Sequence, residues 1–75
     1  MIVNPTSDQN TELCRRIEAS VLRVADVRGL RCIAHDGRFV LSGEVNTRDE
    51  AMMCGVVARL VPGAGAVIND IRVQS

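Results

Sequence analysis

The dipeptide that most constrains the fold is Asp36-Gly37, which lies between two runs of strand-forming residues. A type I′ turn needs positive φ at both central positions, and Asp and Gly tolerate that conformation. The segment 30–45 is therefore predicted to be a β-hairpin. Its expected pairs are His35 with Arg38, Ala34 with Phe39, Ile33 with Val40, Cys32 with Leu41 and Arg31 with Ser42.

Because side chains alternate along a strand, this pairing gives the hairpin two faces. A one-residue slip would expose the whole apolar face, so the register should be well fixed. Gly43 lies on the apolar face, where we expect either a close approach of a helix backbone or a bulge that bends the strand. The core face carries Leu30, Cys32, Ala34, Phe39, Leu41 and Val45. The opposite face carries Arg31, Ile33, His35, Arg38, Val40, Ser42 and Glu44.

A helix is predicted before the hairpin. Residues 1–7 form a loose arm, because Pro5 disfavours helix at the preceding residue, and the helix begins near Ser7 or Asp8, both good caps. The helical pattern fails over residues 25–29, and Gly29 is expected to end the segment. The apolar stripe at helical spacing consists of Leu13, Ile17, Val21 and Val24. Polar residues away from its centre are Arg15, Arg16, Glu18 and Arg23.

A second helix is predicted from Arg48 to Leu60. Thr47 and Glu50 form a capping box in front of an apolar run, and Pro62-Gly63 stops the helix. Its small-residue stripe lets it lie close to the sheet near Gly43. The stripe consists of Ala51, Cys54, Ala58 and Val61, with Val57 and Leu60 beside it.

The segment 66–74 alternates as a third strand. Because a strand–helix–strand crossover is right-handed, this strand should lie parallel to the second hairpin strand, which is central. Asn69 falls on the inward face and needs a backbone or loop partner. The inward face carries Val67, Asn69, Ile71 and Val73. The outward face carries Ala66, Ile68, Asp70 and Arg72.

Composition excludes several function classes. The 75 residues suffice for one domain, assigned to residues 8–75, and nine acidic and nine basic residues give zero net charge. A nucleic-acid binder usually shows a basic excess and stacking aromatics, whereas this chain has no Trp or Tyr and one Phe. No apolar run can span a bilayer, and the N-terminus does not read as a secretory signal. As written, the chain is expected to be cytoplasmic; an excised module would be periplasmic or envelope-associated.

No catalytic, metal or cofactor site is predicted. His35 is the only histidine and lies at the hairpin tip, while Asp49 and Glu50 are explained by helix capping. The three cysteines, Cys14, Cys32 and Cys54, match no zinc or redox spacing. We expect them to be free thiols that pack as small hydrophobic groups.

The sequence resembles the BON domain, named for bacterial osmotically induced and nodulation proteins, over about residues 8–75. The resemblance implies an α+β fold in the order αββαβ, with two helices on one face of a three-stranded mixed sheet. It also implies a non-enzymatic module of cell-envelope proteins that binds phospholipid or other envelope components. Ala64 departs from the family, which usually has Val after Pro-Gly. The matching residues are Asp36-Gly37, Phe39, the LSGEV segment 41–45, Pro62-Gly63, Val67, Asn69, Ile71 and Val73.

Two binding functions follow. The first is association with an anionic phospholipid surface or other envelope component. The second is a protein–protein contact, including a homodimer, through the sheet face that the helices leave open. Salt should weaken lipid binding more than apolar sheet packing. The candidate residues on the open face are Arg31, Ile33, His35, Arg38, Val40, Ile68 and Arg72. A weaker candidate cluster on the first helix consists of Arg15, Arg16 and Arg23.

Overall fold

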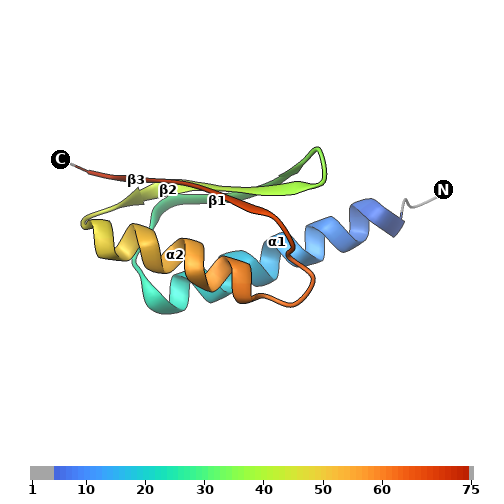
Figure 1. Cartoon of the computed structure of the whole chain (residues 1–75), viewed down its shortest axis with the longest axis horizontal. Coiled ribbons are helices and arrows are strands. Elements are labelled where there is room, and N and C mark those ends of the chain that lie inside the picture. Colours follow the sequence, from blue (N-terminus) through green and yellow to red (C-terminus); the bar gives the residue numbers. More distant parts are fainter. Residues whose placement is uncertain (1–4, 75) are drawn as a thin grey trace.

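The protein has two layers, a three-stranded sheet and a pair of helices that cover one of its faces (Figure 1). The computed structural model describes residues 5–74, with side chains from residue 9 onward. The order αββαβ and the α+β class are those predicted. The elements are α1 (Pro5–Val24), β1 (Arg28–His35), β2 (Arg38–Val45), α2 (Arg48–Leu60) and β3 (Val67–Val73).

The sheet has the predicted order β1-β2-β3, with β2 antiparallel to β1 and parallel to β3. Asp36 and Gly37 have φ values of 51° and 74°, as a type I′ turn requires. All five predicted hairpin pairs are present, from His35 with Arg38 to Arg31 with Ser42. Turn chemistry and the alternation of apolar residues therefore set the register together.

The helical pattern was expected to fail over residues 25–29, which is confirmed, but Gly29 does not end that segment as expected. The helix ends at Val24, and Gly29 lies inside β1 with φ 63°, where the register with β2 shifts by one residue. Opposite it, a Cβ on Gly43 would lie 2.6 Å from Cγ1 of Val27. A bulge was one of the two expectations for Gly43, and a bulge is present, but it lies in the neighbouring strand β1. The atoms nearest to a Cβ on Gly43 belong to residues 27, 28 and 30 rather than to a helix backbone.

The first helix begins earlier than predicted. It starts at Pro5 rather than Ser7 or Asp8, because proline suits the first helical position, where no backbone N–H partner is needed. The rest of the predicted arm, residues 1–4, lies outside the described residues. Ile17 and Val21 are fully buried, but Val24 is exposed and Ala25 takes its place in the core. The buried stripe therefore steps four residues from Val21 to Ala25, whereas the prediction stepped three residues to Val24.

The second helix has the predicted bounds. Thr47 is its N-cap, and the Thr47 hydroxyl accepts a hydrogen bond from the Glu50 backbone N–H at 3.1 Å. Cys54 and Ala58 are fully buried, as the small-residue stripe predicted, and Val61 is nearly so. Leu60, which was placed beside the stripe, is instead the most exposed large apolar residue in the described part of the chain.

Asn69 links β3 to α2, and it has the backbone partner that was predicted for it. Its side-chain amide donates to the Ala51 carbonyl at 2.9 Å, and its side-chain oxygen accepts from the Ile71 backbone N–H at 3.2 Å. A Cβ on Gly55 would lie 2.6 Å from the Asn69 amide nitrogen. Gly55 therefore lets α2 approach β3 closely.

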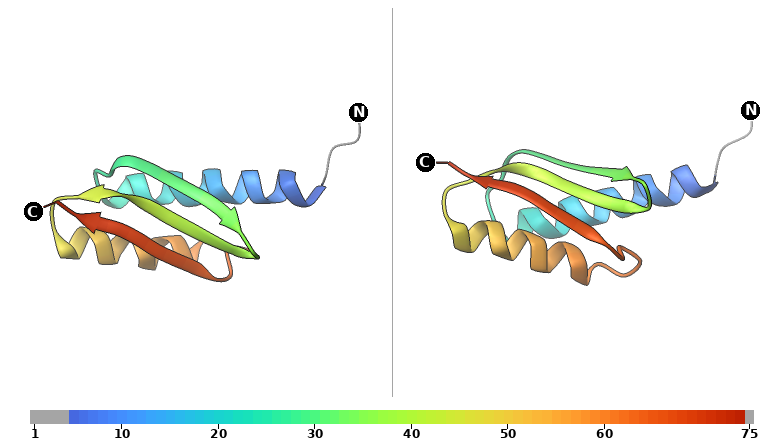
Figure 2. Two further views of the ribbon diagram at one scale, coloured as in Figure 1. Left: turned by 90° about the horizontal axis from the view of Figure 1, so that it is seen from above. Right: turned by 45° about the horizontal axis from the view of Figure 1, so that its top comes forward.

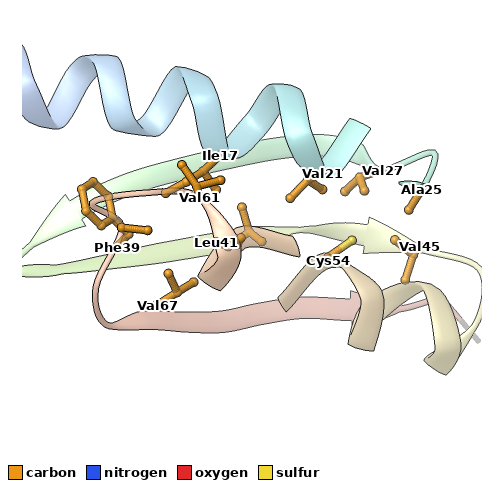
Figure 3. Packing of buried hydrophobic residues seen from close by; sticks show 12 residues of the cluster. Ile17, Val21, Ala25, Val27, Phe39, Leu41, Val45, Cys54, Val61 and Val67 are labelled. Atoms are coloured by element: carbon orange, nitrogen blue, oxygen red, sulfur yellow. The ribbon is translucent and has the colours of Figure 1, made fainter. Parts of the chain in front are cut away.

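The two helices run antiparallel beneath the sheet, with α1 along the β1 side and α2 along the β3 side (Figure 2). The core lies between the layers, and β2 contributes Phe39, Leu41 and Val45 to it (Figure 3). Near the end of β3 the inward face of the strand is no longer buried, since Val73 is exposed. Residues that are fully buried and largest in volume are Ile17, Leu41, Val21, Val45 and Cys54.

Candidate functional site

The sheet face that the helices leave uncovered carries an apolar row across all three strands. Ile33 pairs with Val40, and Val40 pairs with Ile68, so the three side chains stand side by side. Ile33 is 51% exposed and Ile68 is 42% exposed, while Val40 between them is half-buried. These residues were predicted to share the open face, and their register shows that they form one continuous row.

Charged residues flank the apolar row toward the C-terminal end of β2. Ser42 lies between Arg31 and Asp70, and the next row places Glu44 between Arg28 and Arg72. Two carboxylates therefore stand among the basic groups. Because the charges alternate, this end of the sheet presents a surface of mixed charge.

Arg28 is a residue of this face that the sequence analysis missed. Its guanidinium donates to the Asn46 side-chain oxygen at 3.1 Å and to the Gln74 side-chain oxygen. The bulge at Gly29 shifts Arg28 opposite Glu44, so simple alternation from the turn could not have placed it. A depression of about 300 Å³ lies among Arg28, Ser42, Gly43, Glu44, Asp70 and Arg72.

The hairpin end of the open face holds His35 and Arg38, which pair across the turn. The His35 Nε2 atom lies 3.4 Å from an Asp36 carboxylate oxygen, and both side chains are exposed. An exposed pair of this kind contributes little stability. Within residues 9–74, no group of three His, Cys, Asp or Glu side chains lies close enough to hold a metal ion.

The three predicted arginines of α1 do not form one cluster. Arg15 and Arg16 both contact Glu12, at 4.0 and 3.3 Å. Arg16 and Arg23, but not Arg15, line a groove of about 410 Å³ between the two helices. The α2 side of this groove is apolar and consists of Val57, Leu60, Val61 and Pro62.

The outer face of α2 is a second apolar surface that the sequence analysis missed. Met52 is 66% exposed and Leu60 is 75% exposed, with Met53 and Val56 also exposed. Met52, Val56 and Leu60 recur every four residues, so they share one side of the helix. The four-residue spacing is present in the sequence, but the predicted buried stripe lies on the opposite side of the helix. We call Met52, Met53, Val56 and Leu60 the α2 ridge.

In the part of the chain that the structure describes, neither helix is long and apolar enough to cross a bilayer. The α2 ridge and the groove beside it are instead surface features, formed by one amphipathic helix and the basic side of its neighbour. Such a combination suits contact with an interface that is apolar inside and negatively charged at its surface.

Comparison with protein families gives one match. The model of the BON domain matches residues 6–75, which is nearly the whole chain. Comparison with curated protein sequences gives no match.

Proposed function

The chain belongs to the BON domain family, and from this premise we propose that it is a non-catalytic module that associates with anionic phospholipid at a membrane surface of the cell envelope. BON domains in general are lipid-binding, membrane-binding or protein-interaction modules, and the family is non-catalytic. Among these partners we propose phospholipid, because the exposed α2 ridge lies beside a groove lined by arginines.

The α2 ridge supplies the apolar part of this contact. Met52, Val56 and Leu60 lie along one side of the helix and are all exposed, so they can enter the boundary between headgroups and acyl chains without unfolding the domain. Unbranched Met side chains adapt to an irregular surface. Burial of exposed apolar area releases about 25 cal/mol per Å², which favours docking by this face.

The groove supplies the ionic part. Arg16 and Arg23 line the α1 side of it, and Leu60 lines the α2 side. A guanidinium forms paired hydrogen bonds to phosphate oxygens, and each basic group near an anionic surface contributes about 1 kcal/mol. Arg16 also contacts Glu12, so Arg23 is the stronger candidate for a headgroup. The protein has zero net charge, so the attraction must be local to this face.

Vesicle co-sedimentation tests the proposal. The chain should bind vesicles of phosphatidylglycerol and phosphatidylcholine, bind pure phosphatidylcholine less, and lose binding as salt rises. Arg23→Gln should weaken binding about five-fold, which corresponds to about 1 kcal/mol. Leu60→Gln should weaken it further. The matched controls are Arg38→Gln at the hairpin and Leu22→Gln, an exposed leucine outside the groove.

Two results would contradict this assignment. If Leu60→Gln and Leu22→Gln reduce binding equally, the α2 ridge is not the contact surface. If the anionic vesicles bind no more tightly than neutral ones, phosphate recognition by Arg16 and Arg23 is wrong.

A second candidate function is a protein contact through the open sheet face, including a homodimer. The in-register row of Ile33, Val40 and Ile68 favours it, because an unbroken apolar strip can pack against a second sheet. The charged residues at its border, Arg31, His35, Arg38 and Arg72, would then set the orientation of the partner.

Sedimentation equilibrium separates the two functions. A sheet-packed dimer should persist at high salt, because apolar burial is not screened, and Val40→Lys should abolish it. Val24→Lys is the matched control, since Val24 is an exposed valine on α1, away from the sheet. A monomer at all concentrations would exclude the homodimer and leave vesicle binding as the proposed activity.

A further inference from the structure

Two of the three cysteines, one on α1 and one on β1, meet at the border of the core. Cys14 lies on α1 and Cys32 on the core face of β1, and both are half-buried free thiols packed against the same apolar cluster. Cys54 lies on α2 and is fully buried. Eighteen positions separate Cys14 from Cys32 in the sequence, so only the tertiary fold brings them together.

A backbone hydrogen bond ties α1 to β1 at this place. The Glu18 carboxylate accepts from the Cys32 backbone N–H at 3.2 Å. Glu18 is four residues after Cys14, so the two side chains lie one turn apart on the same side of the helix. Glu18 was predicted to lie away from the centre of the apolar stripe, whereas it is half-buried and accepts from a backbone N–H of an edge strand. The contact holds the turn that carries Cys14 against Cys32.

The thiol groups also interact with each other. Burial, a side-chain hydrogen bond with Cys14 and the nearby Glu18 carboxylate raise the pKa of Cys32 to about 12. The raised pKa disfavours the Cys32 thiolate, which makes Cys32 a poor first nucleophile. Burial and the Glu50 carboxylate raise the pKa of Cys54, which lies on the other helix.

We propose that Cys14 and Cys32 form a reversible oxidation site, in which a low-molecular-weight disulfide of the glutathione class converts them to an intramolecular disulfide. The Cys14 sulfur attacks one sulfur of the oxidant and expels the other as a thiol. Cys32 then attacks the Cys14 sulfur and passes its proton to the departing sulfur, which leaves as the second thiol. The two protein thiols lose two electrons and two protons, and one oxidant disulfide becomes two thiols.

The bond would fasten α1 to the edge strand β1. It closes a loop of 19 residues, from Cys14 to Cys32 inclusive, that contains the second half of α1 and the connection through Val27. A cross-link of this span restricts the unfolded chain much more than the folded one, in which the two segments already lie together. Oxidation should therefore raise the melting temperature on the order of 10 °C.

The test treats the folded chain with oxidised glutathione, blocks remaining thiols under denaturing conditions and measures the intact mass. The expected product has lost two hydrogens, carries one blocked cysteine and returns to three after reduction. Tryptic digestion should link the peptide that ends at Arg15 to the peptide 32–38. Cys54→Ser should give the same cross-link and the same rise in melting temperature.

Cys14→Ser and Cys32→Ser should each lose the cross-link and the temperature rise. Circular dichroism of the reduced variants establishes that they are folded before oxidation. Three stable mixed disulfides with glutathione, a cross-link that includes Cys54, or disulfide dimers alone would each overturn the proposal.

Discussion

Gly55 and Asn69 constrain each other at the α2–β3 contact. A glycine inside a helix costs about 1 kcal/mol relative to alanine, so Gly55→Ala would stabilise a helix without tertiary contacts. Here the new Cβ would displace the Asn69 amide from the Ala51 carbonyl. We therefore expect Gly55→Ala to give no gain in the free energy of unfolding, measured by urea denaturation.

The same substitution in an Asn69→Ala background removes the 2.6 Å contact with the amide nitrogen and leaves only the residue 69 Cβ, at 3.3 Å. Gly55→Ala should then stabilise by about 1 kcal/mol relative to Asn69→Ala alone, because only helix propensity is left. Equal gains in both backgrounds would show that the Asn69 contact does not require a glycine at residue 55.

The start of α2 depends on one hydroxyl. Thr47 has extended backbone angles, and its side chain accepts from the Glu50 backbone N–H, with Asp49 and Glu50 in the first turn. Thr47→Ala should lower the free energy of unfolding by about 0.5–2 kcal/mol, because that N–H loses its partner. Chemical denaturation measures the change. Thr47→Ser keeps the hydroxyl and should stay close to the wild type; an equal loss in both variants would contradict capping by this group.

The whole domain depends on a small core. A protein of this size retains only about 3–5 kcal/mol of net stability. Leu41 is fully buried on the central strand, and its truncation to Ala should cost about 2–5 kcal/mol. Leu41→Ala should therefore be largely unfolded at 37 °C by circular dichroism, whereas Leu60→Ala, at an exposed site, should change stability by less than about 0.5 kcal/mol. A folded Leu41→Ala protein would show that this truncation costs less than the net free energy of unfolding of the domain.

Local chemistry by itself determined the hairpin and the second helix. Asp36-Gly37 set the turn, the turn and the alternation set five strand pairs, and Thr47 set the start of α2. These features depend on residues that are adjacent in the chain or at a fixed period, so a sequence contains the information for them. The face of the open apolar row followed from the same alternation.

Only the tertiary structure decided which residues from different elements meet. The bulge at Gly29 moved Arg28 opposite Glu44, Glu18 reached the backbone of β1, and Leu60 faced outward beside Arg23. It also brought Cys14 beside Cys32, 18 positions apart. The physical reason is that helical and strand periods give the side of an element, while the depth and position at which two elements pack depend on every side chain between them.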